Sequence, residues 1–299
     1  MSQKITLLDG GMGQELLSRS TRPVTSLWSA DIMLNEPELV RDLHSDFIKS
    51  GARVITLNTY TATPERLTRE NEMANIGKLH QSAMRAALDA RDNAMCDGVR
   101  IAGCLPPLVA SYRPEVSLSF DQALPSYQRL VALQEPASDL FICETMATIA
   151  EASAACHAAR DAGKSIWVAF TVSDTDAGAL RSGESVQDAV NAVQQYKPEA
   201  ILLNCSQPEA VDASWRGLSL ATQAIGAYAN GFKSVSDLHP GGTVENMETR
   251  EDLGPSRYAK HALNWIKNGA SIVGGCCEIG PKHIAYLHQA LLAQGYELS

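Results

Sequence analysis

The 299-residue chain is 45% apolar and 20% charged, a balance typical of a folded globular protein rather than a disordered or fibrous one. Its formal net charge of -9, with no block of Lys and Arg, argues against nucleic acid as a partner and favours small-molecule ligands. No segment approaches the roughly 20 apolar residues that cross a bilayer, and the N-terminal MSQKITLLDGG lacks the apolar centre of a signal peptide. We therefore expect a cytoplasmic protein without a membrane partner.

Short apolar runs rich in Val, Ile and Leu recur along the chain. Each is followed by a polar or glycine-bearing turn and then by a segment with helical periodicity. In chain order, the predicted strands are residues 5–8, 53–58, 99–104, 139–144, 165–171, 200–205, 224–229 and 271–276. The clearest helical segments between them are residues 36–52, 150–164, 185–197 and 256–270.

Eight alternations of apolar strand and amphipathic helix, with no linker between them, predict a single-domain α/β fold. The predicted fold is a (β/α)8 TIM barrel that spans residues 1–299. The alternative is an open doubly wound sheet, which usually carries a GxGxxG fingerprint before its first helix. The run DGGMGQEL matches that fingerprint only in part, and no acidic residue ends the second predicted strand. The sequence therefore argues against a dinucleotide site.

Polar residues follow most of the predicted strands, at the end where barrel enzymes carry their active sites. Each could serve a turn alone, because Asp, Asn and Gly favour turns for local backbone reasons. Their common position at one rim favours a functional site. In chain order they are Asp9-Gly10-Gly11, Asn58-Thr59-Tyr60, Glu144-Thr145, Asn204-Cys205, Asn230-Gly231 and Cys276-Cys277.

The chain has seven cysteines, and in a reducing compartment we expect no structural disulfide among them. Cys104, Cys143 and Cys156 are interpreted as small buried apolar residues. Adjacent residues on a strand point to opposite faces, so Cys276 and Cys277 can share one metal only where the backbone turns sharply. The preceding glycines, 274 and 275, permit such a turn. The alternative for this pair is two buried thiols in a tight turn.

Cys205 ends the sixth predicted strand, one strand away from the Cys276-Cys277 pair in a barrel. It could complete a set of three thiolates. Three soft ligands with no fixed fourth protein ligand suit a Zn²⁺ ion with an open position, which is the arrangement of a catalytic zinc site. The fourth position would then receive a substrate.

These motifs together resemble the zinc-dependent homocysteine S-methyltransferases. That family includes S-methylmethionine-dependent and betaine-dependent enzymes and the homocysteine-binding module of methionine synthase. The resemblance covers almost the whole chain. Its most specific part is a lone Cys after Asn combined with a late GGCC, and the matching runs are DGGMGQEL, NTYTAT, ICET, NCSQPEAV and GASIVGGCCEIGPKHI.

The resemblance implies that Cys205, Cys276 and Cys277 hold Zn²⁺ and that the thiolate of L-homocysteine takes the open position. It implies that Asp9, with Gly10 and Gly11, and Glu144 hold the amino-acid end of homocysteine. Thr59 matches a family position that contacts the substrate, and Asn230 matches an asparagine that could occupy the fourth zinc position before substrate arrives. The alternatives are a turn or helix-capping role for Asp9 and a solvent-facing side chain for Glu144.

The methyl donor is the second expected small-molecule partner. The chain is too short to include folate, cobalamin and activation modules, so we expect a free donor, with S-methylmethionine first, S-adenosylmethionine second and betaine third. A corrinoid protein acting in trans is an alternative. GCLPPLVASYRPE, YANGF and Thr145 depart from better-known members and leave the donor open, while Trp28 and Tyr112 are candidate aromatic contacts for a cationic methyl group.

Other functions compatible with the cysteines are methyl transfer to a different thiol or selenol, a zinc hydrolase, and a non-catalytic module that binds zinc or thiols. A hydrolase normally needs a His or Glu base near the bound water, and an electron-rich three-thiolate site acidifies water poorly. The sequence makes no prediction about oligomeric state.

Overall fold

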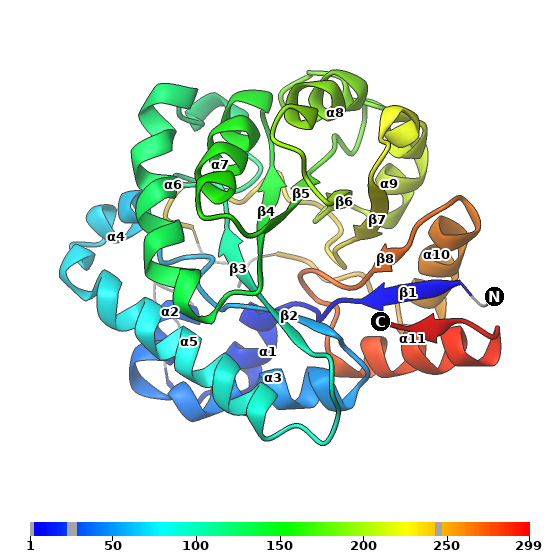
Figure 1. Cartoon of the computed structure of the whole chain (residues 1–299), viewed down its shortest axis with the longest axis horizontal. Coiled ribbons are helices and arrows are strands. Elements are labelled where there is room, and N and C mark those ends of the chain that lie inside the picture. Colours follow the sequence, from blue (N-terminus) through cyan, green and yellow to red (C-terminus); the bar gives the residue numbers. More distant parts are fainter. Residues whose placement is uncertain (1–2, 23–28, 243–246) are drawn as a thin grey trace.

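A computed structural model describes residues 3–22, 29–242 and 247–299. All eight predicted strands are present, and neighbouring strands pair in parallel (Figure 1). A bridge between Leu8 and Val54 links the first strand to the second and completes the barrel. The strands are β1 (Lys4–Leu7), β2 (Val54–Thr56), β3 (Arg100–Leu105), β4 (Leu140–Met146), β5 (Ser165–Phe170), β6 (Ala200–Asn204), β7 (Ala224–Tyr228) and β8 (Ile272–Val273).

A ninth strand, β9 (Glu297–Leu298), was not predicted from the sequence. It follows the last helix and pairs in parallel with the start of β1, where Lys4 faces Glu297 and Ile5 faces Leu298. Figure 1 shows it as a short red arrow beside the blue β1. Two residues are too few to show an alternation of polar and apolar side chains, so the sequence could not predict β9. The strand forms by pairing with β1.

Helices follow the strands and surround the barrel (Figure 1). The predicted helical segments correspond to α3, α7, α8 and α10. Two of them begin with the expected side-chain caps, since Thr148 accepts from Glu151 N and Ser185 accepts from Asp188 N. The helices are α1 (Met12–Arg19), α2 (Ser29–Asn35), α3 (Pro37–Lys49), α4 (Pro64–Arg69), α5 (Ile76–Asp92), α6 (Phe120–Gln134), α7 (Ile149–Asp161), α8 (Val186–Gln194), α9 (Pro208–Ser214), α10 (Pro255–Lys267) and α11 (Pro281–Ala293), with 3₁₀ turns at Met73–Asn75, Pro114–Val116, Glu135–Ala137 and Trp215–Leu220.

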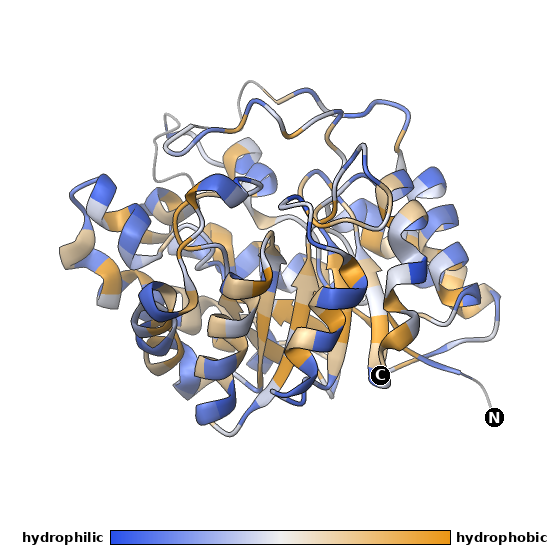
Figure 2. Cartoon of the chain, turned by 90° about the horizontal axis from the view of Figure 1, so that it is seen from above, coloured by the Kyte–Doolittle hydropathy of each residue, from blue (hydrophilic) through white to orange (hydrophobic). Residues whose placement is uncertain are grey.

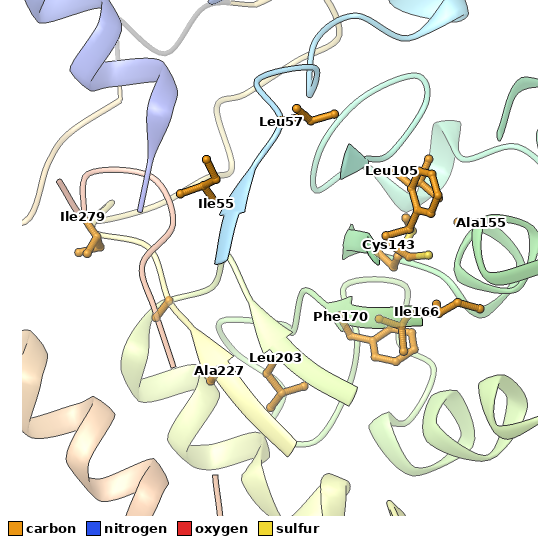
Figure 3. Close-up of a cluster of buried hydrophobic side chains, with 14 of the residues drawn as sticks. Ile55, Leu57, Leu105, Cys143, Ala155, Ile166, Phe170, Leu203, Ala227 and Ile279 are labelled. Atoms are coloured by element: carbon orange, nitrogen blue, oxygen red, sulfur yellow. The ribbon is translucent and has the colours of Figure 1, made fainter. Parts of the chain in front are cut away.

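The apolar side chains form two layers. One cluster includes Leu140, Ile142, Trp167 and Leu202 and fills the barrel. A larger cluster packs the outer faces of the strands against the helices, and Figure 3 shows part of it. Cys143 and Cys156 belong to this larger cluster, as predicted. Buried layers on both faces explain why the strands read as continuous apolar runs.

The carboxyl ends of the strands and the chain termini lie at opposite ends of the barrel. Figure 2 shows apolar strands enclosed by helices, with both labelled termini at the lower end and the long connections above the strands. The carboxyl ends of the strands meet these connections. Among the described residues, no helix is both long and apolar enough to traverse a bilayer.

Candidate functional site

A hollow of about 890 Å³ opens at the carboxyl ends of the strands. Residues from six strand ends line it, which is where active sites of parallel barrels lie. The hollow is therefore the expected site. The strand-end residues that the sequence analysis predicted and that line it are Asp9, Gly10, Gly11, Asn58, Tyr60, Glu144, Cys205, Cys276 and Cys277.

The structure brings the three predicted cysteines together. The Sγ atoms of Cys205, Cys276 and Cys277 all lie within 4.8 Å of one another, and those of Cys205 and Cys277 are 3.8 Å apart. Three soft thiols at this spacing fit a Zn²⁺ ion, which prefers sulfur ligands and tetrahedral geometry. The cluster could therefore hold a metal ion.

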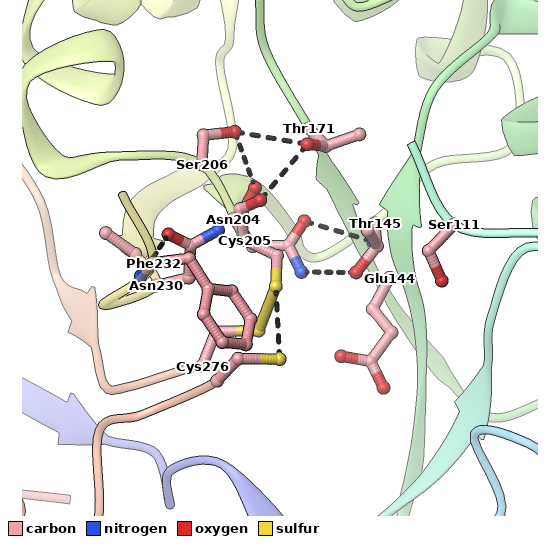
Figure 4. Close-up of a disulfide and its surroundings, with 12 residues drawn as sticks. Ser111, Glu144, Thr145, Thr171, Asn204, Cys205, Ser206, Asn230, Phe232 and Cys276 are labelled. Atoms are coloured by element: carbon pink, nitrogen blue, oxygen red, sulfur yellow. Dashed lines mark hydrogen bonds between the residues drawn. A yellow bond between two sulfur atoms is a disulfide. The ribbon is translucent and has the colours of Figure 1, made fainter. Parts of the chain in front are cut away.

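Cys205 and Cys276 form a disulfide in the structure, with Cα atoms 5.5 Å apart (Figure 4). The expectation that no disulfide forms is therefore wrong for this pair. Cα atoms at this separation lie within the range that a disulfide requires, so the convergence that lets thiols share one ion also lets two of them bond. Bound metal and disulfide are alternative states of the same sulfur atoms.

The backbone around the cysteines is unusual. Cys205 has a φ of 45°, and its N–H donates to Tyr228 O at 3.0 Å. Such a left-handed residue is typical of functional sites that the surrounding structure holds in place. The turn of the cysteine pair comes at Glu278, with a φ of 67°, and neither Gly274 nor Gly275 has a positive φ. The two glycines instead allow close approach, because an added Cβ would collide with the Leu8 or Ile279 side chain, respectively.

Tyr112 reaches the sulfur cluster from the loop after β3. Its hydroxyl lies 2.9 Å from Cys205 Sγ, and burial raises its pKa well above the usual value, so it stays protonated. The Arg181 guanidinium lies over the Tyr112 ring, 5.1 Å from its centroid. Tyr112 thus faces the cavity as an aromatic side chain, whereas Trp28 lies outside the described residues.

Asp9 and Glu144 form the acidic side of the cavity. Asp9 Oδ2 accepts from Thr56 N at 2.7 Å. The N-cap of helix α1 is Gly11 and no side chain caps the helix, so Asp9 is not a helix cap. Glu144 is only 9% exposed and Cys104 Sγ donates to it at 2.9 Å, which excludes a solvent-facing role. Burial raises the pKa of Asp9 to about 8 and that of Glu144 to about 7. Both carboxyls therefore favour a cationic partner.

We expect the ligand-free protein to lose stability as pH rises from 5 towards 8.5. A carboxyl with a raised pKa in the folded state retains a proton that the unfolded chain releases, so its contribution declines as pH passes from the unfolded pKa to the folded one. The slope is at most roughly 1.4 kcal/mol per pH unit for one carboxyl. Melting temperatures across this range should fall more steeply for the unchanged protein than for Asp9→Asn. Exposed Asp97→Asn is the control, and equal slopes for all three proteins would contradict the prediction.

Two predicted residues do not line the cavity. Thr59 Oγ1 donates to Gln134 Oε1 at 3.1 Å within the protein, and Thr59 is 1% exposed. Asn230 Oδ1 accepts from Phe232 N at 3.3 Å. The substrate and zinc roles of Thr59 and Asn230 stay predictions.

Gly10 and Gly11 lie against the cysteine loop. A Cβ on Gly10 would collide with Ile279 O, and one on Gly11 would lie 2.7 Å from Cys276 O. The Gly11 N–H donates to Ile279 O at 3.0 Å. Besides lining the cavity, the glycine pair therefore provides the space in which the cysteine loop sits.

Two further polar side chains of the cavity have atoms without a partner in the described part of the chain, and of these Asn58 was singled out from the sequence but Gln14 was not. Both amide atoms of Gln14, and Nδ2 of Asn58, are buried with no hydrogen-bond partner among the residues described. Both residues line the hollow. Buried polar atoms are normally satisfied, so unpartnered ones indicate a ligand contact. Gln14 lies within the DGGMGQEL motif, and its place one turn after Gly10 was the available signal.

Comparison with known proteins agrees with this geometry. A family model described as homocysteine S-methyltransferase matches residues 6–291. The chain belongs to the homocysteine S-methyltransferase family. It is 28% identical to the homocysteine S-methyltransferase of Escherichia coli K12, covering 95% of this chain and 94% of that protein. It is 26% identical to homocysteine S-methyltransferase YbgG of Bacillus subtilis, covering 94% of this chain and 92% of that protein.

Solved structures give the same result for the fold of this homocysteine S-methyltransferase. The metallated form of the homocysteine methyltransferase MmuM from E. coli superimposes with a TM-score of 0.81 at 26% identity, covering 96% of each chain. Its oxidized form gives the same TM-score of 0.81. A type I 3-dehydroquinate dehydratase from Clostridium difficile, with a TM-score of 0.53 at 7% identity, shares the fold alone. The predicted barrel, the family and the enzyme class are therefore confirmed.

Proposed function

We propose that this enzyme transfers a methyl group from S-methylmethionine to the thiolate of L-homocysteine, with S-adenosylmethionine as the second candidate donor. In the same proposal, Cys205, Cys276 and Cys277 hold Zn²⁺. The observation that carries it is one cavity with three converging thiols on one side and two buried carboxyls on the other. Homocysteine has the matching groups, a thiol at one end and an ammonium at the other.

The carboxyl groups would bind the ammonium of homocysteine. Asp9 and Glu144 are buried acids, and a cation beside them favours their charged forms. Asn58 Nδ2, which has no hydrogen-bond partner among the described residues, is a donor in the same cavity and suits the substrate carboxylate. The substrate would therefore lie with its thiol towards the cysteine cluster.

The reaction needs a thiolate and a cationic methyl donor in line. A free thiol has a pKa of about 8.5 and is mostly protonated at neutral pH. Zn²⁺, when bound, supplies a Lewis acid that keeps the acceptor deprotonated. The acceptor sulfur forms the new S–CH₃ bond as the methyl–sulfur bond of the donor breaks, and the bonding electron pair stays on the donor sulfur. A sulfonium donor thus becomes a neutral thioether, and the cavity's task is alignment.

The aromatic walls of the cavity support a cationic donor. Tyr60, Tyr112 and Phe232 line the hollow, and Tyr112 and Phe232 pack in one cluster with Cys205. Aromatic faces attract cations such as sulfonium and quaternary ammonium groups. A site for three reduced thiols also suits a reducing compartment, consistent with the cytoplasmic location that we propose.

The proposed reaction is tested by methionine formation from L-homocysteine. Reduced, zinc-loaded protein receives S-methylmethionine, S-adenosylmethionine or betaine in parallel. We expect methionine with S-methylmethionine at a rate at least tenfold above the other donors. Methionine from betaine alone would overturn the donor assignment. No methionine with any donor, but transfer to selenohomocysteine or another thiol, would overturn the acceptor assignment.

A further inference from the structure

We propose that a second hollow beside the cavity binds the carboxylate of the methyl donor. This inference rests on the proposed function. The hollow has a volume of about 510 Å³, and Ser111 and Leu238 line both it and the main cavity. The two spaces therefore adjoin at these residues, and one extended ligand can reach from the first into the second.

Arg66, on helix α4, supplies the main charge of this second hollow. Its Nη2 donates to Pro107 O at 3.0 Å and to Ser111 Oγ at 3.3 Å, which are neutral acceptors. Its Nε is buried without a hydrogen-bond partner in the part of the chain that the structure describes. A buried guanidinium held by neutral oxygens, with its Nε left over as a donor, is suited to bind a carboxylate.

Arg69 adds a second guanidinium to the same hollow, whereas His239 lines it as the acceptor of a hydrogen bond from Arg113. Arg69 Nη1 donates to Val109 O at 3.3 Å, and its Nε pairs with Glu70 Oε1 at 2.9 Å. His239 Nδ1 lies 2.6 Å from Arg113 Nη2. Two arginines against one carboxylate leave a positive lining on a chain whose formal net charge is -9, so the hollow favours an anion.

Contacts connect this hollow to the sulfur cluster. The Arg66 guanidinium lies over the Tyr60 ring, 5.4 Å from its centroid, and Tyr60 OH lies 2.8 Å from Ser111 Oγ. The next residue, Tyr112, touches Cys205 Sγ through its hydroxyl at 2.9 Å. A cationic methyl group against these tyrosine rings would have its carboxylate beside Arg66.

The length of the donor decides which class fits. In S-methylmethionine, as in S-adenosylmethionine, three carbons separate the sulfonium from the carboxylate carbon. Betaine has one carbon there, so its cation and its carboxylate lie closer together than those of a sulfonium donor. A donor that extends from the cysteines into the second hollow is therefore more readily a sulfonium amino acid than betaine, because the sulfonium amino acid is longer.

The test removes either the negative charge of the donor carboxylate or the positive charge of an arginine in the second hollow. Donors are S-methylmethionine and S-methylmethioninamide, whose carboxylate is replaced by an amide, with homocysteine as acceptor. Proteins are the unchanged enzyme, Arg69→Gln and Arg66→Gln, with exposed Arg41→Gln on α3 as the matched control. We expect both hollow variants to raise KM for S-methylmethionine tenfold or more, while KM for homocysteine changes less than twofold. The amide donor should have a high KM that the variants do not change.

Several results would overturn the inference. These are an unchanged donor KM in both hollow variants, an equal rise for the amide donor, or a rise in the homocysteine KM instead. Arg69 is largely at the surface, so its variant keeps the test valid where Arg66→Gln fails to fold, as judged by circular dichroism. Failure of the proposed function looks different, because the unchanged enzyme would then bind homocysteine calorimetrically but form no methionine with any donor.

Discussion

Replacing Cys277 by serine is expected to reduce methyl transfer to homocysteine by roughly a thousandfold or more and to abolish tight zinc binding. Zn²⁺ sites of the open type use three protein ligands, and a hydroxyl is a much harder and less acidic donor than a thiol. The Sγ atoms of Cys277 and Cys205 are 3.8 Å apart, within reach of one shared ion. Removal of the Cys277 thiol would leave that ion only two protein ligands. Metal content by mass spectrometry and methionine formation, measured on the same reduced sample, check the two expectations.

The matched control is Cys96→Ser. Cys96 is a free cysteine, half-buried, and belongs to no cysteine cluster in the described ranges. The control protein should retain its zinc and its activity within about twofold, because a substitution away from a site changes little. Full activity in Cys277→Ser would mean that the methyl acceptor is activated without this cluster. Zinc retained without activity would place Cys277 in the reaction but not among the metal ligands.

The barrel could be predicted from the sequence because its periodicity is strong. Strands buried on both faces read as uninterrupted apolar runs, and the intervening helices have one apolar face. The prediction overextended the last strand, placed at residues 271–276, because β8 ends at Val273 and the glycines continue as loop. The sequence also missed β9, whose two residues are ordered by pairing with β1. Both differences lie where neighbouring backbone, not local pattern, decides the structure.

The site was predictable to the extent that parallel strands end at one rim. That rule brought together Asp9, Glu144 and the cysteines. It could not show which way a side chain turns after the strand ends. Thr59 follows β2 but donates to Gln134 inside the protein, whereas Gln14, which no strand-end rule selects, faces the cavity.

Positive φ angles at residues other than glycine are a further feature that could not be predicted from the sequence. Thr145 has a φ of 60°, and the Asn204 side chain binds it twice, accepting from its N–H at 3.0 Å and donating to its hydroxyl at 2.9 Å. Cys205, the residue after Asn204, is itself left-handed. The asparagine of the NCSQPEAV motif thus fixes the backbone beside Glu144 while its neighbour supplies a sulfur. Neither Thr nor Cys favours this conformation, so no local signal announces it.

Gly10→Ala is expected to lower zinc affinity at least about a hundredfold and to destabilise the fold by roughly 2–4 kcal/mol. The added Cβ would overlap Ile279 O, a backbone atom that cannot rotate away, and would also press on the Phe47 ring. Ile279 lies two residues after Cys277 and its N–H donates to Cys276 O at 3.0 Å, so moving it moves the cysteine loop. Zinc titration with a competing chelator measures the affinity, and urea unfolding measures the stability.

Gly77→Ala separates this effect from the general cost of replacing a glycine. Gly77 lies in the first turn of α5 with nothing within 4 Å of an added Cβ, so alanine there should stabilise the helix by about 0.5–1 kcal/mol. Zinc affinity should not change. Gly10→Ala should therefore lower the free energy of unfolding and Gly77→Ala should raise it. We expect this difference only if the close approach of the cysteine loop requires a glycine at position 10. If Gly10→Ala bound zinc as the unchanged protein does, the cysteine loop would have to form independently of the first strand end.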